Sequence, residues 1–299
     1  MKNNTNNLFV GYILLFIQPI FMASNSIIAR GGVVYVPPIS LAFFRWFLVL
    51  LILLPFTYKN IIKDFSSIKK DYKKYLFLGF MGCGVCGAFP FLAGMTTTVT
   101  NIGIIYTSSP IFIILLSFII FKEKIFKHQI LGLILCLFGV FVIIIKSDYR
   151  LLLSFRFTAG DLWVLGAAIG WALYAIFLMK WKSKLSFFTR LTVIAFFGSL
   201  SLSVFSISEH FFVREIVFDK YFYYWTLFAA LSPGIIAYTL HNKLQNYLGV
   251  STSGFIIYLF AVYGSLYGIF LFDEKLETYH YLGAILVFSG VFLAKKRLS

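Results

Sequence analysis

Long apolar runs follow one another along this sequence, and this feature limits the folds that the chain can adopt. Hydrophobic residues make up 60% of the 299 residues and charged residues only 12%, whereas soluble domains are about half apolar and about a quarter charged. A hydrocarbon layer about 30 Å thick is crossed by roughly 20 apolar residues in a helix. The runs are continuously apolar, which indicates helices rather than the alternating strands of a membrane barrel. We therefore predict an all-α integral membrane protein, surrounded by the lipid bilayer.

Polar and charged residues divide these runs into ten predicted transmembrane helices, five in each half of the chain. Those of the first half are Leu8–Ile28, Pro38–Thr57, Tyr75–Met95, Ile102–Phe121 and Gln129–Ile145. Those of the second half are Leu162–Met179, Leu191–Ile207, Tyr223–Leu240, Phe255–Phe272 and Tyr281–Ala294. The first run is too long for the core of a signal peptide, so we expect it to remain as the first span.

The basic residues indicate how the chain is oriented. With the N-terminus in the cytoplasm, the predicted cytoplasmic loops and ends carry 18 Lys and Arg residues and the opposite side carries 7. Short loops rich in Lys and Arg stay in the cytoplasm, so both termini are predicted to be cytoplasmic in a bacterial inner membrane. The net charge of +15 is thus a topology signal, and we predict no nucleic-acid partner because the basic residues lie in short loops.

The second half of the sequence repeats the first. The motif Glu123-Lys124 recurs as Glu274-Lys275, and the pair Gly132 and Gly139 recurs as Gly283 and Gly290, always at an offset of 151 residues. This predicts two repeats, residues 1–150 and 151–299. Five spans per repeat is an odd number, so the second repeat must enter the membrane in the opposite sense. Inverted repeats of this kind underlie alternating access around a site between the halves, and the glycine pairs predict close helix packing.

Several motifs in each half resemble the EamA family of the drug/metabolite transporter superfamily. In the first half these are Ser24-Asn25, Phe44-Arg45 and the run from Pro110 to Lys124; in the second they are Gly160-Asp161-Leu162, Trp171-Ala172-Leu173-Tyr174 and Phe272-Asp273-Glu274-Lys275. The resemblance covers nearly the whole chain. It implies ten helices in two five-helix repeats and the transport of amino acids, other metabolites or drugs. One departure is Ala261, where the family usually has a proline, as Pro110 is in the first repeat.

Arg45 is the sharpest candidate for contact with a solute, because a permanent charge within a span is costly and usually faces a cavity or a partner. It can bind a carboxylate or phosphate with both arms of its guanidinium. Alternatively, it reaches the outer interface or joins neighbouring helices. Asn25 is predicted to line the solute path, whereas Thr107 and Ser108 either line it or bond to neighbouring helices.

Five aromatic residues of the second half complete the predicted substrate-binding set. They combine a hydrogen-bonding head with a large apolar face, and they are Trp171, Tyr174, Tyr238, Tyr258 and Tyr263. They either line a cavity for an amphipathic solute or pack against lipid and other helices.

The sequence does not indicate an enzyme. The stretch Gly82–Gly87 spells a dinucleotide fingerprint, but it lies within an apolar run and follows no strand. Cys83, Cys86 and Cys136 lie in apolar segments and are interpreted as small packing residues. We predict no catalytic residues, no metal and no cofactor.

Together these features predict a carrier of a small-molecule substrate, with an amino acid or another small carboxylate favoured. Every acidic residue falls in a loop or at the end of a span, which favours facilitated diffusion or exchange over proton coupling. The alternative is a membrane protein that does not transport solutes or that handles lipids. The sequence leaves an oligomer open but does not indicate one.

Overall fold

A computed structural model describes residues 2–122, 126–144, 158–253 and 256–295, and every regular element within those ranges is a helix. The first half forms α1 (Lys2–Gly31), η1 (Gly32–Val34), α2 (Pro38–Lys63), α3 (Phe65–Lys70), α4 (Tyr72–Gly79), η2 (Phe80–Val85), α5 (Cys86–Gly94), α6 (Val99–Tyr106), α7 (Ser109–Phe121) and α8 (Lys127–Ile144). The second forms α10 (Ala159–Lys180), α11 (Phe187–Phe212), α12 (Lys220–Ala229), η3 (Ala230–Ile236), α13 (Ala237–Ser253), α14 (Ile256–Phe272) and α15 (Thr278–Lys295). The all-α prediction is confirmed for these residues.

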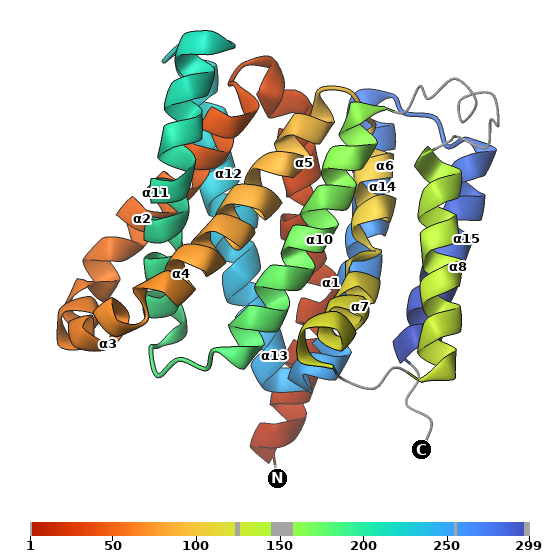
Figure 1. Ribbon diagram of the computed structural model, residues 1–299, viewed down its shortest axis with the longest axis horizontal. Helices are drawn as coiled ribbons and strands as arrows, with labels where there is room; N and C mark the ends of the chain where they lie inside the picture. Colours follow the sequence, from red (N-terminus) through yellow and green to blue (C-terminus); the bar gives the residue numbers. More distant parts are fainter. Residues whose placement is uncertain (1, 123–125, 145–157, 254–255, 296–299) are drawn as a thin grey trace.

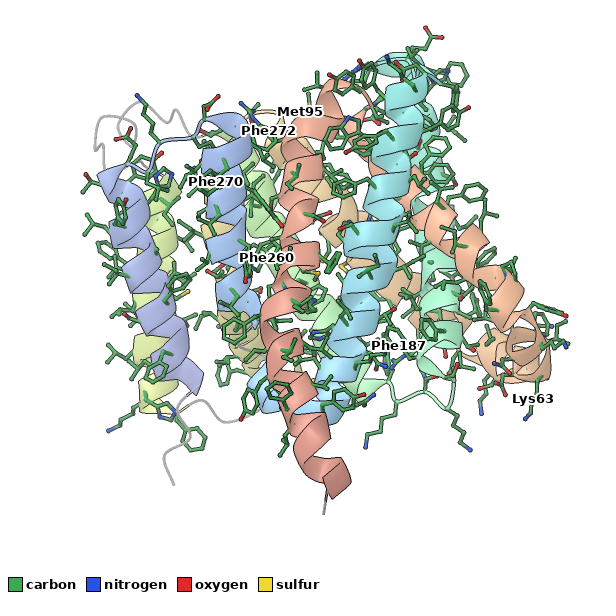
Figure 2. All side chains as sticks on the ribbon, turned by 180° about the vertical axis from the view of Figure 1, so that it is seen from behind. Lys63, Met95, Phe187, Phe260, Phe270 and Phe272 are labelled. Carbon is green, nitrogen blue, oxygen red and sulfur yellow. The ribbon has the colours of Figure 1, made fainter. Side chains whose placement is uncertain are left out.

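The helices have the length and surface of a membrane protein. Within the described ranges, six stretches are long and apolar enough to cross a bilayer: Leu8–Val34, Pro38–Lys63, Tyr72–Gly94, Val99–Ile120, Ala159–Lys180 and Phe187–Phe212. Two shorter apolar helices, Ile130–Ile143 and Leu259–Phe272, accompany them. Many large apolar side chains are exposed on the outside of the bundle. Phe270, for example, is 77% exposed (Figure 2), which suits contact with lipid. The prediction of ten crossings remains a prediction.

The two halves of the chain run in opposite directions (Figure 1). α1 begins and α15 ends at the same end of the bundle, which we call the terminal end; the other is the far end. α1 runs from the terminal end to the far end, whereas α10, which opens the second half, runs back from the far end. α8 and α15, the last helices of the two halves, stand together at one edge of the bundle.

The backbone repeats its irregularities at the same offset as the sequence. Lys122 and Asp273, which are 151 residues apart, have left-handed φ angles of 54° and 53° and follow the ends of α7 and α14. One difference follows from Ala261. Pro110 lies in the first turn of α7, just after the interruption of the helix between α6 and α7. In the second repeat, α14 continues through Ala261 without interruption.

Glycines hold α8 and α15 close together, as their spacing predicts. A Cβ atom on Gly290 would lie 2.6 Å from the backbone nitrogen of Cys136 and 2.6 Å from the carbonyl oxygen of Gly132. A Cβ on Gly139 would similarly lie 2.8 Å from the backbone nitrogen of Val287. Because the obstructing atoms belong to the backbone, no side-chain rotation relieves such a contact.

We expect Gly290→Ala to destabilise the protein. The added methyl group would force α8 and α15 apart, and overpacking of this kind costs about 1–3 kcal/mol. The measurement is thermal unfolding of the purified protein in detergent. Gly264→Ala is the matched control, because α14 is also buried at Gly264 but a Cβ there would meet nothing closer than 3.9 Å. Equal melting temperatures for the two variants would contradict the packing account.

Candidate functional site

The third helical stretch of each half contains a π-helical segment at an equivalent place. η2 spans Phe80–Val85 in the first half, and η3 spans Ala230–Ile236 in the second. Gly82 and Pro233 lie 151 residues apart within these segments. Glycine and proline weaken a regular α-helix, and π-helical turns are frequent at functional sites. The two irregular segments therefore mark where a site would lie.

A small cavity of about 40 Å³ lies between the two repeats, and Gly82 and Pro233 both line it. Its other lining residues come from α1, α2, α5 and α6 of the first repeat and from α10, α13 and α14 of the second. The most bulky or polar of them are Asn25, Arg45, Trp46, Tyr106, Trp171, Tyr238 and Phe260. The volume suits about three water molecules. A metabolite would require the cavity to widen.

Arg45 is the only charged residue among the described residues that line the cavity. Its side chain is only 5% exposed, so it does not extend to an interface. Nη1 donates to Asn25 Oδ1 at 2.8 Å, and Nη2 donates to the carbonyl oxygen of Pro233 at 3.2 Å. The guanidinium also lies 4.8 Å from the centroid of the Trp46 ring. Arg45 thus joins α1, α2 and η3 around the cavity.

No described acidic side chain neutralises the charge of Arg45. Within the part of the chain that the structure describes, no carboxylate lies within ion-pair distance of the guanidinium, and its Nε atom has no hydrogen-bond partner. Burying a cation without a counter-charge is costly. The cavity therefore has the electrostatic character of an anion site.

Four of the nine predicted binding residues line this cavity: Asn25, Arg45, Trp171 and Tyr238. Tyr174 lies next to it, with its ring 5.5 Å from that of Trp171, and it packs over Gly82. The structure thus brings the main charged, amide and aromatic candidates to one place.

The other four predicted residues lie elsewhere. Thr107 and Ser108 are fully buried, and their hydroxyl groups donate to the carbonyls of Ile104 at 2.6 Å and Ile105 at 2.7 Å, within their own turn. Their polar groups are thus satisfied where α6 ends. Tyr263 is half-buried on α14 and does not line the cavity. The side chain of Tyr258 lies outside the described residues.

Several cavity residues were not predicted from the sequence. Trp46, Tyr106 and Phe260 form much of its aromatic wall. A signal existed for Trp46, because an indole next to an intramembrane arginine on the same helix can pair with it through its ring face. Tyr106 and Phe260 have no comparable signal, since aromatic residues are common throughout this chain.

The described structure gives the cysteines and the glycine-rich stretch neither a disulfide nor the strand that a dinucleotide fingerprint needs. Cys83, Cys86 and Cys136 are free and buried, and Cys86 donates to the carbonyl of Ala167 at 3.6 Å. The fingerprint-like stretch is helical, in η2 and α5, and follows no strand. Within the described ranges, no group of three metal-binding side chains occurs.

At the far end, carboxylates of the second repeat bind the first. Glu274 accepts hydrogen bonds from the backbone nitrogens of Val99 (2.7 Å) and Thr100 (3.0 Å), where α6 begins. Glu209 accepts in the same way from Ile39 (3.1 Å) and Ser40 (2.7 Å), where α2 begins. A carboxylate at a helix N-terminus satisfies free N–H groups and complements the helix dipole.

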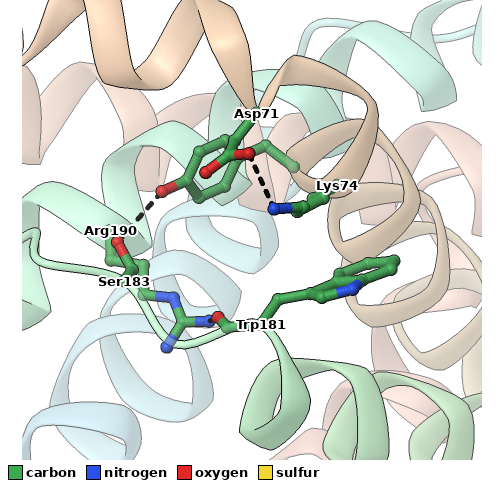
Figure 3. Close-up of polar contacts among 6 residues, drawn as sticks. Asp71, Lys74, Trp181, Ser183 and Arg190 are labelled. Carbon is green, nitrogen blue, oxygen red and sulfur yellow. Dashed lines mark hydrogen bonds and ion pairs between the residues drawn. The ribbon is translucent and has the colours of Figure 1, made fainter.

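Further polar contacts between the repeats lie at both ends. At the far end, the carboxylate of Asp161 accepts from Asn101 at 3.0 Å and also from Thr97. At the terminal end, Tyr75 and Ser183 share a hydrogen bond of 3.0 Å (Figure 3). Arg190 nearby donates to the carbonyl of Trp181 at 2.8 Å. The cavity therefore lies between two sets of contacts that join the repeats.

Comparison with known proteins identifies the class. The profile of the EamA-like transporter family matches residues 9–145 and again residues 158–295. The chain therefore belongs to this family and is a multi-pass membrane transporter, as the sequence motifs predicted. The double match also supports the repeat architecture.

Individual relatives are similar along almost their whole length. The transporter YyaM of Bacillus subtilis, itself uncharacterised, is 26% identical over 290 residues, which are 95% of this chain and 92% of that protein. An uncharacterised transporter of Archaeoglobus fulgidus is 24% identical over 286 residues, or 94% of this chain and 96% of that protein. A crystal structure at 17% identity matches the fold with a TM-score of 0.60, covering 95% of this chain and 97% of the other.

We expect Glu209→Gln to lower the stability of the protein. The neutral amide cannot accept from both Ile39 and Ser40 as the carboxylate does, and it loses the interaction with the dipole of α2, a loss of about 1–2 kcal/mol. Glu215→Gln is the control, because Glu215 is exposed. Thermal unfolding in detergent should separate the two variants. A control that melts as early as Glu209→Gln would argue against the capping role.

Proposed function

We propose that the protein moves a small metabolite that carries a carboxylate group, such as an amino acid, across a bacterial inner membrane by alternating access. The observation that supports this most is Arg45, a buried cation beside a cavity between the two repeats, without a carboxylate partner among the described residues. Intramembrane charges usually mark solute pathways, and a guanidinium binds carboxylates strongly. A substrate anion would supply the missing counter-charge.

The aromatic wall suits the rest of such a solute. Trp171, Tyr238 and Phe260 offer apolar surface with a few polar heads around the cavity. Binding sites for small molecules commonly combine a mostly apolar lining with a few polar groups that fix the orientation of the ligand. In this proposal, Arg45 and Asn25 hold the carboxylate while the rings contact the body of the metabolite.

Alternating access follows from the position of the cavity between oppositely directed repeats. In this proposal, opening towards one side breaks the inter-repeat contacts at that end and keeps those at the other. The set around Glu274 and Glu209 would act at the far end, and the pair Tyr75 and Ser183 at the terminal end.

The proposed energy source is the solute gradient itself, by facilitated diffusion or exchange. Proton-coupled carriers generally place a titratable carboxylate or histidine in the pathway, and no acidic residue is among the described residues that line this cavity. The proposed membrane orientation, with both termini in the cytoplasm, is supported by the bias of Lys and Arg and by the common end of α1 and α15 (Figure 1). The proposed repeat boundary, between residues 150 and 151, lies outside the described residues.

We expect Arg45→Gln to reduce uptake of a carboxylate substrate by roughly 10- to 100-fold, because hydrogen bonds to a charged partner contribute about 1.5–3 kcal/mol. Candidate solutes are first chosen by their ability to raise the melting temperature of the purified protein, since a ligand of the folded state stabilises it. Uptake of the radiolabelled solute is then measured in proteoliposomes.

Arg30→Gln is the control for this variant. Arg30 also donates to a carbonyl, that of Gly94 at 3.0 Å, but it does not line the cavity. Uptake that survives in Arg45→Gln would remove the central support for the proposal. Movement of labelled lipid without any solute flux would instead favour a lipid-handling protein, and uphill uptake driven by a pH gradient alone would exclude facilitated diffusion.

A further inference from the structure

Two hydrogen-bond donors in the cavity wall have no acceptor in the part of the chain that the structure describes. They are Nε of Arg45 and the indole Nε1 of Trp46, and each is buried with no hydrogen-bond partner among the described residues. Trp46 is only 2% exposed, and both residues line the cavity. Buried donors are normally satisfied, so two adjacent exceptions at one cavity need an explanation.

The surroundings of Trp46 fix its ring and leave space at its N–H group. The guanidinium of Arg45 lies 4.8 Å from the ring centroid, and the ring of Tyr238 meets it edge-on at 5.8 Å. On the other side, a Cβ atom on Gly87 would lie 2.9 Å from Trp46 Nε1. Gly87 also lines the cavity, and its lack of a side chain leaves room beside the indole nitrogen.

We propose that Trp46 determines specificity by donating its indole N–H to one oxygen of the substrate carboxylate while Arg45 Nε donates to the other. This inference rests on the proposed function. A carboxylate supplies two acceptor oxygens and a negative charge, which match two donors beside an uncompensated cation. A carboxamide of the same shape offers one acceptor and an NH₂ group that cannot accept, so the site discriminates against it.

The sequence of α2 makes this arrangement specific to the first repeat. Counted at the same offset of 151 residues, the positions of Arg45 and Trp46 fall on Phe196 and Phe197 in the second repeat. Neither phenylalanine has a polar group, so the symmetric scaffold holds one carboxylate site and has no equivalent of it in the other half. The substrate would consequently be held in a single orientation with its carboxylate towards α2.

The test uses isovalerate and isovaleramide, which have the same shape and differ in charge, with protein that carries ¹⁵N-labelled tryptophan. The indole N–H signal of Trp46 is the one lost in Trp46→Phe. If that variant does not fold, phenylalanine variants of the other four of the five tryptophans identify the signal by elimination. We expect isovalerate to shift the Trp46 signal in the wild-type protein and isovaleramide to leave it unchanged. A Trp46 signal that does not respond to isovalerate, or responds equally to both compounds, would overturn the inference.

The variant Trp46→Phe keeps the aromatic ring and removes the donor. We expect its affinity for isovalerate to fall by roughly tenfold or more, since a donor to a charged acceptor is lost, with its affinity for isovaleramide unchanged. Trp163→Phe is the control, because Trp163 is 38% exposed and does not line the cavity.

The outcomes separate the two proposals. If the Trp46 signal shifts with isovalerate but the protein transports no solute, the result supports the carboxylate site and contradicts the proposed transport function. The opposite result is that uptake falls in Arg45→Gln while Trp46→Phe and the wild type take up the solute equally. That result supports the carrier and overturns the role of Trp46.

Discussion

The hydrocarbon layer offers no water to polar groups, and most of this structure follows from that constraint. Every backbone N–H and C=O group must find a partner within the protein, so the chain forms helices. Helices that end or bend inside the bundle need additional partners. Glu209 and Glu274 provide them at the first turns of α2 and α6, and the hydroxyl groups of Thr107 and Ser108 provide them where α6 ends. At these interruptions, polar side chains thus replace the partners that a continuous helix would supply.

The same constraint explains why the irregular backbone lies at the cavity. The segments η2 and η3 depart from the α-helical pattern in equivalent positions, and a residue of each, Gly82 and Pro233, faces the cavity. The carbonyl of Pro233 accepts a hydrogen bond from Arg45. The buried cation is therefore partly solvated by the backbone of one repeat and by the Asn25 amide of the other. These neutral groups ease the burial of the charge but supply no negative charge, a combination that fits the proposed anion site.

The sequence predicted the large features and only part of the site, for physical reasons. Helices and repeats are encoded by apolar runs and by charged and glycine residues at a fixed offset, and both signals extend over many residues. Arg45 and Asn25 stood out because polar groups are rare in membrane spans. Aromatic residues carry no such contrast in a chain with 37 phenylalanines and 18 tyrosines, so Tyr263 was selected and Tyr106 was missed. Only the packing of helices from both repeats decides which rings face the cavity.

The contacts between the repeats bear on the proposed alternation between conformations. Among the described residues, the far end joins the repeats through three carboxylates, Asp161, Glu209 and Glu274, and the terminal end includes the neutral pair of Tyr75 and Ser183. Hydrogen bonds to charged groups are stronger than neutral ones, so in the proposed alternation these carboxylate contacts contribute much of the free energy needed to open the far end. A ligand shifts such an equilibrium only by the difference between its affinities for the two states. A carboxylate that drew Arg45 away from Pro233 would loosen the junction of α2 and η3, which belong to different repeats. Binding at the cavity would then offset part of the cost of opening the far end, and the same residue would recognise the solute and couple it to the movement of the repeats.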